Sequence, residues 1–434
     1  MTRIQSFDRT EESISQLLRP DRFRQLLVSL GNPNVIPRGS GLNYCQASAI
    51  SGGSSVLSCM FNRFLAYDQN QRLIRVEPGV TVGELLDFAV ANDLMPPVLP
   101  GYPTITVGGA LAMNVHGKNQ FRAGNFGEHV RRLSIYHPRH GILNCSFEEN
   151  ADLFNLTIGG FGLTGFILSV DIQLEPLRGK SVRVERHKVN NLIDAVELME
   201  SMANRSDWLY SWHDLNQSDK LFGRGIVYLE NFADGETYKA KNQMFDSSSC
   251  SLPWSLLNKV TAPILCNAYG AMERIASVNE NISLYQAYFP IVGKEFYFRL
   301  FGRSGFREYQ VIFPRETWIE VVEEISVKIK KSGVPITLSS LKLFQGKRKM
   351  LNFVGDGICF AIDAPNNAKS IALFNLLDET AIKFGGIGNI AKDGRLSART
   401  IALMYDGYSD FSNGLHAHDP DAHFQSELRR RLNV

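Results

Sequence analysis

Residues 100–112 read Pro-Gly-Tyr-Pro-Thr-Ile-Thr-Val-Gly-Gly-Ala-Leu-Ala and lead into Asn-Val-His-Gly-Lys-Asn at 114–119. Paired glycines followed by small residues allow a cofactor chain to lie flat against the backbone, with amides turned to a pyrophosphate. His116 and Lys118 add polar groups close to this loop, although His116 alone is equally typical of a hydrogen-bonded loop histidine. The run therefore predicts a cofactor-binding loop.

Two further glycine-rich runs lie on either side of it in the sequence. Residues 38–44 read Arg-Gly-Ser-Gly-Leu-Asn-Tyr, where small residues let amides converge on an anion, although a tight connection is an equal alternative. Gly160, Gly162 and Gly165 have the GxGxxG spacing of a dinucleotide-binding turn. That motif must open a helix, whereas residues 166–174 alternate like a strand. We therefore expect a loop that faces a phosphate or a flavin ring, and not a Rossmann turn.

Composition limits the classes of protein. The 434 residues suggest two or three domains, and a net charge of +2 gives no reason to expect nucleic acid. No stretch approaches 18 uninterrupted apolar residues, and residues 1–30 lack the apolar core of a secretory signal. The six cysteines form no CxxC pair, which predicts free thiols in a reducing, cytoplasmic compartment and no metal site. They are Cys45, Cys59, Cys145, Cys250, Cys266 and Cys359.

The first part of the chain alternates short apolar runs with turn residues. Thr81 and Glu84 form a capping-box pattern that predicts a helix after them, and apolar spacing predicts a second helix at about 12–27. The expected strands are 35–37, 72–76, 132–136 and 165–170.

After Pro176 glycines become rarer and longer strand-like runs appear between two amphipathic helices. This order suggests an antiparallel sheet with helices on one face, and hence an α+β fold. A basic helix is expected from about Asp421 to Leu432. The other predicted elements are strands at 308–313, 337–344 and 358–362 and helices at 318–331 and 368–384.

These motifs together resemble a known family. Thr106–Ala110, His116–Asn119, Ala123–Arg131 and Ile158–Gly165 resemble the vanillyl-alcohol-oxidase type of FAD-binding domain. Within that superfamily the chain resembles the decaprenylphosphoryl-β-D-ribose oxidase family, and the similarity covers nearly the whole chain. It includes Ser6–Thr10, Leu341–Phe344, Ile390–Asp393, Met404-Tyr405 and Leu428–Leu432.

The resemblance implies an α+β protein with a two-part FAD-binding domain. Residues 1–178 would form that domain, 179–387 a substrate domain with an antiparallel sheet and helices, and 388–434 a C-terminal segment that returns to the FAD domain. Many relatives attach FAD through a histidine in the first glycine-rich loop, and this loop contains none, so we expect non-covalent FAD. The implied cofactor-binding residues are Arg38, Gly39, Ser40, Gly41, Leu42, Asn43, Pro100, Gly101, Thr106, Val107, Gly108, Gly109, Asn114, His116, Gly117, Asn119, Gly124, Asn125, Gly127, Gly160, Gly162, Gly165 and Ile167.

The resemblance also implies a reaction: oxidation of a sugar secondary hydroxyl to a ketone. The substrate would be the 2′-hydroxyl of a lipid-phosphate-linked pentose, and a short-chain reductase partner would complete an epimerisation in cell wall biosynthesis. Lys392 would hydrogen-bond the hydroxyl, with His116 and Tyr44 beside the flavin, because a lysine of lowered pKa or a histidine can accept its proton. Lys342 is equally interpreted as a solvated surface lysine. The implied substrate-binding residues are Lys342, Lys118, Glu308, Gln310, Cys359 and Asn389.

Three pocket positions depart from the family pattern. Asn389 stands where the family has a tyrosine, and Glu308 replaces a glutamine, although Gln310 is retained. Gly357 replaces an asparagine two residues before Cys359. A carboxylate at 308 would repel a phosphate unless a cation pairs with it, so the substrate can differ even if the redox chemistry is shared.

Two alternatives to this function remain. One is an alditol or sugar-lactone oxidase that uses oxygen on a free sugar, and the other is a flavin-binding protein without turnover. The presence of both His116 and Lys392 disfavours a mere carrier, which needs neither. A lipid-linked substrate would bring a cytoplasmic enzyme to the inner membrane surface.

Overall fold

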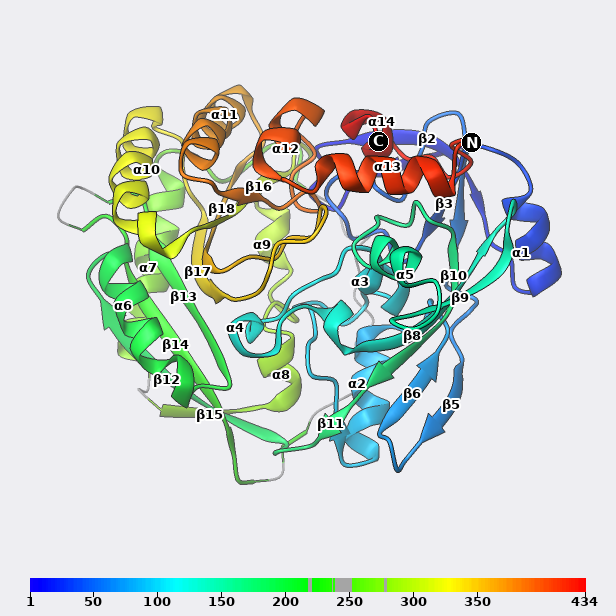
Figure 1. Cartoon of the computed structure of the whole chain (residues 1–434). Helices are drawn as coiled ribbons and strands as arrows, with labels where there is room; N and C mark the ends of the chain where they lie inside the picture. The colour runs from blue at the N-terminus through cyan, green and yellow to red at the C-terminus, as the bar shows by residue number, and fades with distance from the viewer. Residues whose placement is uncertain (218–220, 236, 239–251, 277–278) are drawn as a thin grey trace.

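The computed structural model describes residues 1–217, 221–235, 237–238, 252–276 and 279–434. Figure 1 shows the N-terminal strands and helices, in blue and cyan, on one side of the molecule and the green to orange elements on the other. The last helices, in red, lie over the N-terminal side, where both chain ends are found. Helices and mainly antiparallel sheets are mixed throughout, which confirms the α+β class.

The first sheet has the order β1-β2-β4-β3 and is followed by helix α1. The prediction of a helix over 12–27 is wrong: Glu12–Leu18 is strand β2, in which Ser13 and Ser15 are buried and Ile14 is exposed. Pro20 lacks the amide that a helix interior requires, so the helix begins only after it. The elements are β1 Thr2–Gln5, β2 Glu12–Leu18, α1 Phe23–Leu30, β3 Val35–Arg38 and β4 Ser54–Leu57.

The second sheet, β5-β6-β10-β8-β9, carries the glycine-rich loops on one side. The predicted capping box is present, because Thr81 Oγ1 accepts the Glu84 amide and the Glu84 carboxylate accepts the Thr81 amide. Phe166–Gln173 is strand β10, which confirms the predicted strand and the absence of the helix that a Rossmann turn would open. The elements are β5 Phe64–Asp68, β6 Leu73–Val76, α2 Val82–Ala91, β7 Leu94–Met95, α3 Val107–Ala112, α4 Gln120–Ala123, β8 Val130–His137, β9 Gly141–Ser146, α5 Ala151–Thr157, β10 Phe166–Gln173 and β11 Glu175–Pro176.

The middle of the chain forms two four-stranded antiparallel sheets, β13-β14-β12-β15 and β17-β18-β16-β19. Their edges meet where the Leu341 amide of β17 donates to Ser211 Oγ of β13, at 3.2 Å. The apolar faces of α10 and α11 pack on the β17-β18-β16-β19 sheet, as predicted. The elements are β12 Ser181–Val189, α6 Leu192–Met202, β13 Trp208–Asp214, β14 Arg224–Ala233, α7 Thr261–Ile275, β15 Asn279–Ser283, α8 Leu284–Tyr288, α9 Phe296–Arg299, β16 Phe306–Phe313, α10 Trp318–Ser332, β17 Leu338–Phe344, β18 Gly357–Pro365, α11 Ala368–Lys383 and β19 Ile387–Gly388.

The last segment runs back along the N-terminal sheet. Phe424 forms a bridge with Val35 of β3, and Arg431 pairs with Glu11 at 3.4 Å. The basic helix is shorter than predicted, because the Asp419 carboxylate accepts the amides of residues 423 and 424 and holds them outside any helix. The elements are α12 Ala398–Met404, α13 Tyr408–His418 and α14 Glu427–Leu432.

The described residues contain five of the six cysteines, all of them free thiols, whereas Cys250 lies outside that part of the chain. No helix in the described ranges is long and apolar enough to span a membrane. Within the same ranges, no cluster of His, Cys, Asp or Glu side chains is arranged to hold a metal ion.

Candidate active site

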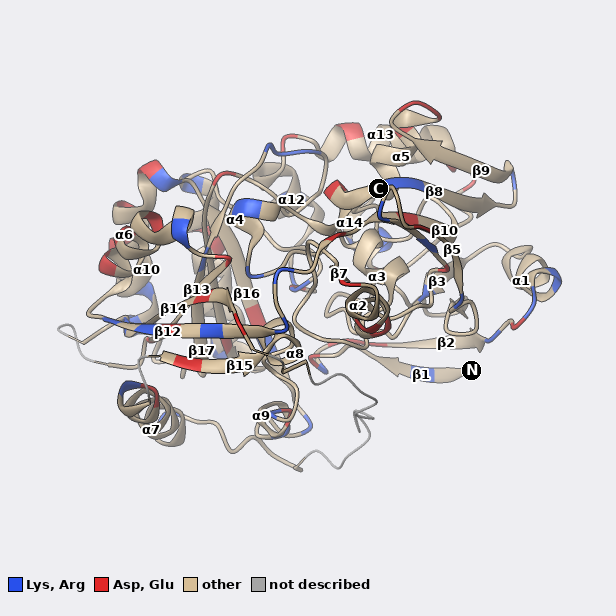
Figure 2. Ribbon diagram, turned by 90° about the horizontal axis from the view of Figure 1, so that it is seen from below, with Lys and Arg blue, Asp and Glu red and all other residues tan. Residues whose placement is uncertain are grey.

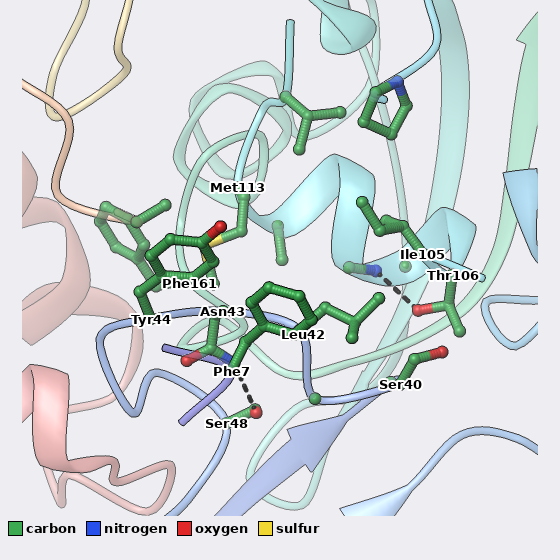
Figure 3. Close-up of a pocket in the computed structure, with 18 of the residues that line it drawn as sticks. Phe7, Ser40, Leu42, Asn43, Tyr44, Ser48, Ile105, Thr106, Met113 and Phe161 are labelled. Carbon is green, nitrogen blue, oxygen red and sulfur yellow. Dashed lines mark hydrogen bonds between the residues drawn. The ribbon is translucent and has the colours of Figure 1, made fainter. Parts of the chain in front are cut away.

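A cavity of about 400 Å³ lies between the glycine-rich loops and the β16–β18 sheet. Figure 3 shows the loop side, with Ser40, Asn43, Tyr44, Thr106 and Met113 around it. Most of the residues predicted from sequence line this cavity. They are Arg38, Gly39, Ser40, Gly41, Leu42, Asn43, Tyr44, Pro100, Gly101, Thr106, Gly108, Gly109, Asn114, His116, Gly162, Gly165, Ile167, Glu308, Gln310, Lys342, Asn389 and Lys392.

The loop side is held together by short hydrogen bonds. Arg38 Nη1 and Asn43 Nδ2 both donate to Ser48 Oγ, at 2.9 Å and 2.8 Å. Thr106 Oγ1 accepts the Gly109 amide at 3.2 Å, which fixes the first turn of α3 (Figure 3). These bonds hold the first two glycine-rich runs in a defined shape before any ligand binds.

This wall has the composition that FAD requires. Gly101 lines the cavity, and a Cβ built on it would meet no atom within 4 Å, so the backbone leaves open space at this position. Arg38 supplies one cation and Ser40, Ser48 and Ser58 supply hydroxyls, which suit a pyrophosphate together with the backbone amides. Apolar Ile105, Met113, Phe161 and Ile167 offer surface for a planar ring. The residues present therefore fit FAD.

Nine predicted site residues lie outside the cavity lining: Val107, Gly117, Lys118, Asn119, Gly124, Asn125, Gly127, Gly160 and Cys359. Lys118 pairs with the buried Glu230 at 2.5 Å and lies 4.7 Å from the centre of the Tyr210 ring. Lys118 therefore binds side chains of the β13-β14-β12-β15 sheet and does not line the cavity. No local pattern in the sequence identifies Glu230 as its partner.

Several of the others support the loop from behind. Asn125 Nδ2 donates to the carbonyls of Asn114 and Phe353, at 2.9 Å and 3.1 Å. The Gly127 amide donates to Asn114 Oδ1 at 2.9 Å, and Asn119 Nδ2 donates to the Pro97 carbonyl at 2.8 Å. This network fixes the backbone around His116.

The opposite wall is built from side chains on neighbouring strands. Glu308 and Gln310 alternate along β16, while Lys342 of β17 stands directly opposite Cys359 of β18. Period-2 alternation places these polar residues on one face and the apolar core on the other. Asn389 Nδ2 donates to Gln310 Oε1 at 2.6 Å, so the replaced tyrosine position contributes an amide to the same layer.

Lys392 lies in a compact group with Glu308 and Tyr44. Its Nζ is 3.1 Å from Glu308 Oε2 and 4.1 Å from the centre of the Tyr44 ring. Burial alone would lower the pKa of Lys392, but the Glu308 carboxylate and Tyr44 raise it above its ordinary value. Lys392 therefore stays protonated and acts as a hydrogen-bond donor. Burial also raises the pKa of Tyr44, which remains a neutral phenol.

The pKa values of Lys342 and His116 are lowered, whereas those of Lys392 and Tyr44 are raised. Burial lowers the pKa of Lys342, helped by the charge of Lys392, and within the described residues its amine makes no hydrogen bond or ion pair. Burial, with the nearby Lys342, lowers the pKa of His116 to about 3, so its imidazole is neutral. Burial raises the pKa of Cys359 to about 12, which keeps it a thiol. Of the two lysines in this wall, Lys342 is therefore the one whose pKa is lowered.

The two ends of the chain meet at this site. The Tyr44 amide donates to the Ala391 carbonyl at 3.2 Å, next to Lys392. Phe7 stacks on Tyr44 with ring centroids 5.5 Å apart and also lines the cavity. A residue near the N-terminus thus supports the side chain that contacts Lys392.

Sequence reasoning missed most of the apolar lining. Some of its members, such as Tyr102, Ile105 and Phe161, lie within the glycine-rich runs and others lie far from them, and an isolated aromatic or apolar residue gives no signal in either place. The one available sign was Ser6–Thr10, whose resemblance to the family's opening segment was noted without assigning Phe7 to the site. The missed residues include Phe7, Tyr102, Ile105, Met113, Phe161, Phe166, Ile291, Phe298 and Phe353.

Comparison with known proteins agrees with this site. Residues 30–146 match the FAD binding domain family. The chain is 30% identical over 418 residues to decaprenylphosphoryl-beta-D-ribose oxidase of Mycolicibacterium smegmatis, which covers 93% of this chain and 90% of that protein. Over shorter stretches it is 28% identical to cytokinin dehydrogenase 3 and 27% identical to L-galactono-1,4-lactone dehydrogenase 1, mitochondrial, both of Oryza sativa subsp. japonica. Those two alignments cover 53% and 44% of this chain and 46% and 32% of the relatives.

These matches make the protein an FAD-dependent oxidoreductase that acts on a CH–OH group. The FAD implied by the family resemblance is thereby confirmed as the cofactor. The chain belongs to the vanillyl-alcohol-oxidase-type family of FAD-binding oxidoreductases, which also includes decaprenylphosphoryl-β-D-ribose oxidase.

Proposed function

We propose that this enzyme oxidises the 2′-hydroxyl of a phosphate-linked pentose to a ketone, as the first half of an epimerisation. We call the cavity wall opposite the glycine-rich loops, which contains Glu308, Lys342 and Lys392, the substrate wall. The observation that carries the proposal is its pair of lysines: Lys392 is charged, and Lys342 has a lowered pKa. The name of the relative that aligns over nearly the whole chain supports the sugar class. A reductase partner would then return the ketone to an alcohol of opposite configuration.

Lys392 and Lys342 have different roles in the proposed reaction because their pKa values are shifted in opposite directions. Lys392, held charged by Glu308, donates a hydrogen bond to the substrate hydroxyl oxygen and stabilises negative charge that develops there. Lys342, whose pKa burial lowers, accepts the hydroxyl proton as general base when its amine is neutral. The glycine-rich loops and Arg38 would hold FAD, which would supply the acceptor for the hydride that leaves the carbon bearing this hydroxyl. Proton and hydride together account for the two hydrogens lost on forming the ketone.

Tyr44 and His116 complete the polar end of the cavity as neutral groups. Tyr44 lies against the Lys392 ammonium, and His116 accepts or donates hydrogen bonds without carrying charge. Gln310 lies beside His116 and accepts a hydrogen bond from Asn389, so its side chain stands between the two. Together they orient the sugar ring.

Anaerobic mixing of the FAD-loaded protein with candidate alcohols tests this proposal. The probe is ribose 1-phosphate esterified with a short isoprenyl alcohol, compared with a free alditol and with galactono-1,4-lactone. We expect only the phosphate-linked ribose to bleach the absorption band of oxidised flavin, with a ketone as product. Bleaching by the alditol or the lactone alone would favour the free-sugar oxidase, and no bleaching by any alcohol would favour a non-catalytic carrier.

A further inference from the structure

Helix α7 presents an apolar face to solvent. Val260, Ile264, Met272 and Ile275 recur at helical spacing, and Ile264, Met272 and Ile275 are 59%, 58% and 85% exposed. The opposite face, with the small residues Ala262 and Gly270, packs inward. A surface helix normally has the reverse arrangement, so this face is built to be covered.

The segments beside α7 extend the same apolar surface. Trp254 is 68% exposed just before the helix, and Phe296 is 62% exposed on α9. The Leu256 amide donates to the Leu300 carbonyl at 2.8 Å, which joins the two segments. Figure 2 shows α7 and α9 at the same edge of the molecule. The α7–α9 surface comprises Trp254, Leu256, Val260, Ile264, Leu265, Tyr269, Met272, Ile275 and Phe296.

The fully exposed charges of these segments are basic, whereas their acidic residues, Glu273 and Glu295, are half-buried. Every exposed charged side chain within 252–275 and 291–303 is basic, namely Lys259, Lys294, Arg299 and Arg303. The acidic Glu273 is turned inward and pairs with Arg186 at 3.0 Å. By contrast, the exposed Ile319 on α10 stands among the exposed Glu316, Glu320 and Glu323. An apolar face bordered by cations matches an anionic lipid surface.

The same segments reach the active-site cavity from their inner side. Ile291 and Phe298 line the cavity, and Phe298 is two residues from the exposed Phe296. Leu257, just before α7, packs in one cluster with Tyr44. The α7–α9 surface is thus continuous with the wall of the site.

We propose that the α7–α9 surface docks the enzyme on an anionic bilayer, with α7 lying in the interface plane. The apolar residues enter the boundary between headgroups and acyl chains, and the basic side chains contact the lipid phosphates. Docking depends only on this surface and goes beyond the proposed sugar oxidation, so either can fail without the other. A lipid-linked substrate would then meet the cavity wall at the membrane.

Co-sedimentation of the full-length, FAD-loaded protein with vesicles tests the docking. We expect binding to vesicles of phosphatidylglycerol and phosphatidylethanolamine that weakens with salt, and much weaker binding to phosphatidylcholine alone. The double variant Ile264→Glu/Met272→Glu should lose roughly tenfold or more in partition coefficient. Each of Arg299→Gln and Arg303→Gln should cost roughly fivefold.

A matched control separates this surface from general surface polarity. Ile319→Glu/Leu403→Glu changes two residues that are 55% and 58% exposed on α10 and α12, and vesicle binding should be unchanged. Oxidation of a soluble sugar probe and the flavin spectrum should be unaffected in both double variants. This comparison excludes misfolding as the cause of lost binding.

Trp254 provides a direct reporter. It is the exposed tryptophan of the described residues, so its emission should move to shorter wavelength on anionic vesicles, and Trp254→Phe should remove the change. The docking proposal is overturned if the native protein ignores anionic vesicles, or if Ile264→Glu/Met272→Glu binds them as well as native. It is also overturned if light scattering finds a dimer that this variant dissociates while vesicles have no effect, because the surface is then a subunit interface.

Discussion

The two walls of the cavity are built in different ways. The cofactor wall is mainly backbone and small residues, drawn from 38–44, 100–116 and 161–167, with Arg38 as its cation. The substrate wall is made of side chains, and it concentrates Glu308, Lys342 and Lys392 in one layer. A backbone wall changes little when side chains are replaced, whereas a side-chain wall changes its chemistry with one substitution.

Two of the three departures from the family pattern, Glu308 and Asn389, lie in the substrate wall, whereas Gly357 lies outside the cavity lining. Glu308 brings a carboxylate that pairs with Lys392, and Asn389 brings an amide that holds Gln310. At Gly357 a Cβ would lie 2.1 Å from the Phe313 carbonyl oxygen, so the family's asparagine cannot fit this backbone. The comparison teaches that the cofactor is retained while the substrate is open to change. The predictions below test this division, from the largest expected effect to the smallest.

Acid denaturation should release all of the flavin into the supernatant. The first glycine-rich loop, 39–43, contains no histidine that could form a covalent bond, so only non-covalent contacts hold FAD to the cofactor wall. Absorbance of supernatant and pellet after precipitation measures the distribution. Flavin that remains with the pellet would contradict non-covalent binding of FAD.

Lys392→Ala should slow flavin reduction by about 10²–10³-fold while FAD stays bound, because a preorganised donor to the reacting oxygen is lost. Stopped-flow reduction measures the rate, and the flavin spectrum measures cofactor content. Lys383→Ala is the control, since Lys383 is 61% exposed and pairs with Glu324. Unchanged reduction in Lys392→Ala would remove this lysine from the chemistry.

Lys342→Met should lower kcat/KM by about 10²-fold or more, the usual contribution of a general base. Only the neutral amine accepts a proton, so native activity should rise as pH rises through the pKa of Lys342, which burial places below the ordinary 10.5. His116 has a pKa of about 3, so the pH–rate profile should show no change in slope near the ordinary histidine pKa of 6.5. A pH–rate profile tests both statements. Persistence of the alkaline limb in Lys342→Met would assign the base elsewhere.

Gly101→Val should weaken FAD binding by roughly 5- to 100-fold, because an added side chain in a filled site costs about 1–3 kcal/mol. The fold should survive, since nothing lies within 4 Å of the new Cβ. Fluorescence titration of the apoprotein with FAD measures the affinity. Gly31→Ala, at the end of α1 and outside the cavity lining, is the control, and equal affinity in both variants would show that Gly101 does not face the cofactor.

Glu308→Gln restores the family residue and leaves the Lys392 charge without its paired carboxylate. It should improve kcat/KM for a phosphate-linked ribose by roughly fivefold, the effect of about 1 kcal/mol of added attraction for the phosphate. A neutral ribose should gain nothing. The pKa of Lys392 should also fall, because its main counter-charge is removed. An equal response to both sugars would locate specificity elsewhere in the substrate wall.

The sequence predicted the cofactor wall well, because glycine-rich loops are contiguous and their small residues have a direct physical meaning. It also predicted β10, the α2 capping box and the helices at 318–331 and 368–384, where local patterns agree with the tertiary structure. The fold class and the FAD cofactor followed from the family resemblance.

The errors have one physical origin, which is contact between distant residues. Ser13 and Ser15 are buried in β2 because they bond Gln46 and Ser55, so tertiary pairing overrides the apolar spacing that predicted a helix. Lys118 is taken by Glu230, which lies 112 residues further on. The pKa values of Lys342 and Lys392 depend on burial and on Glu308 and Tyr44, which are distant in the sequence. No local sequence pattern predicts contacts between residues so far apart in the chain.

The bond between the Tyr44 amide and the Ala391 carbonyl joins residues about 350 positions apart, a closure that folding reaches late. During synthesis the glycine-rich loops emerge long before Lys392. A growing chain can therefore display the cofactor wall while it lacks the charged lysine beside Tyr44. We expect flavin to be accepted before the enzyme can be reduced by sugar, so catalytic competence is acquired only when the last tenth of the chain has been made.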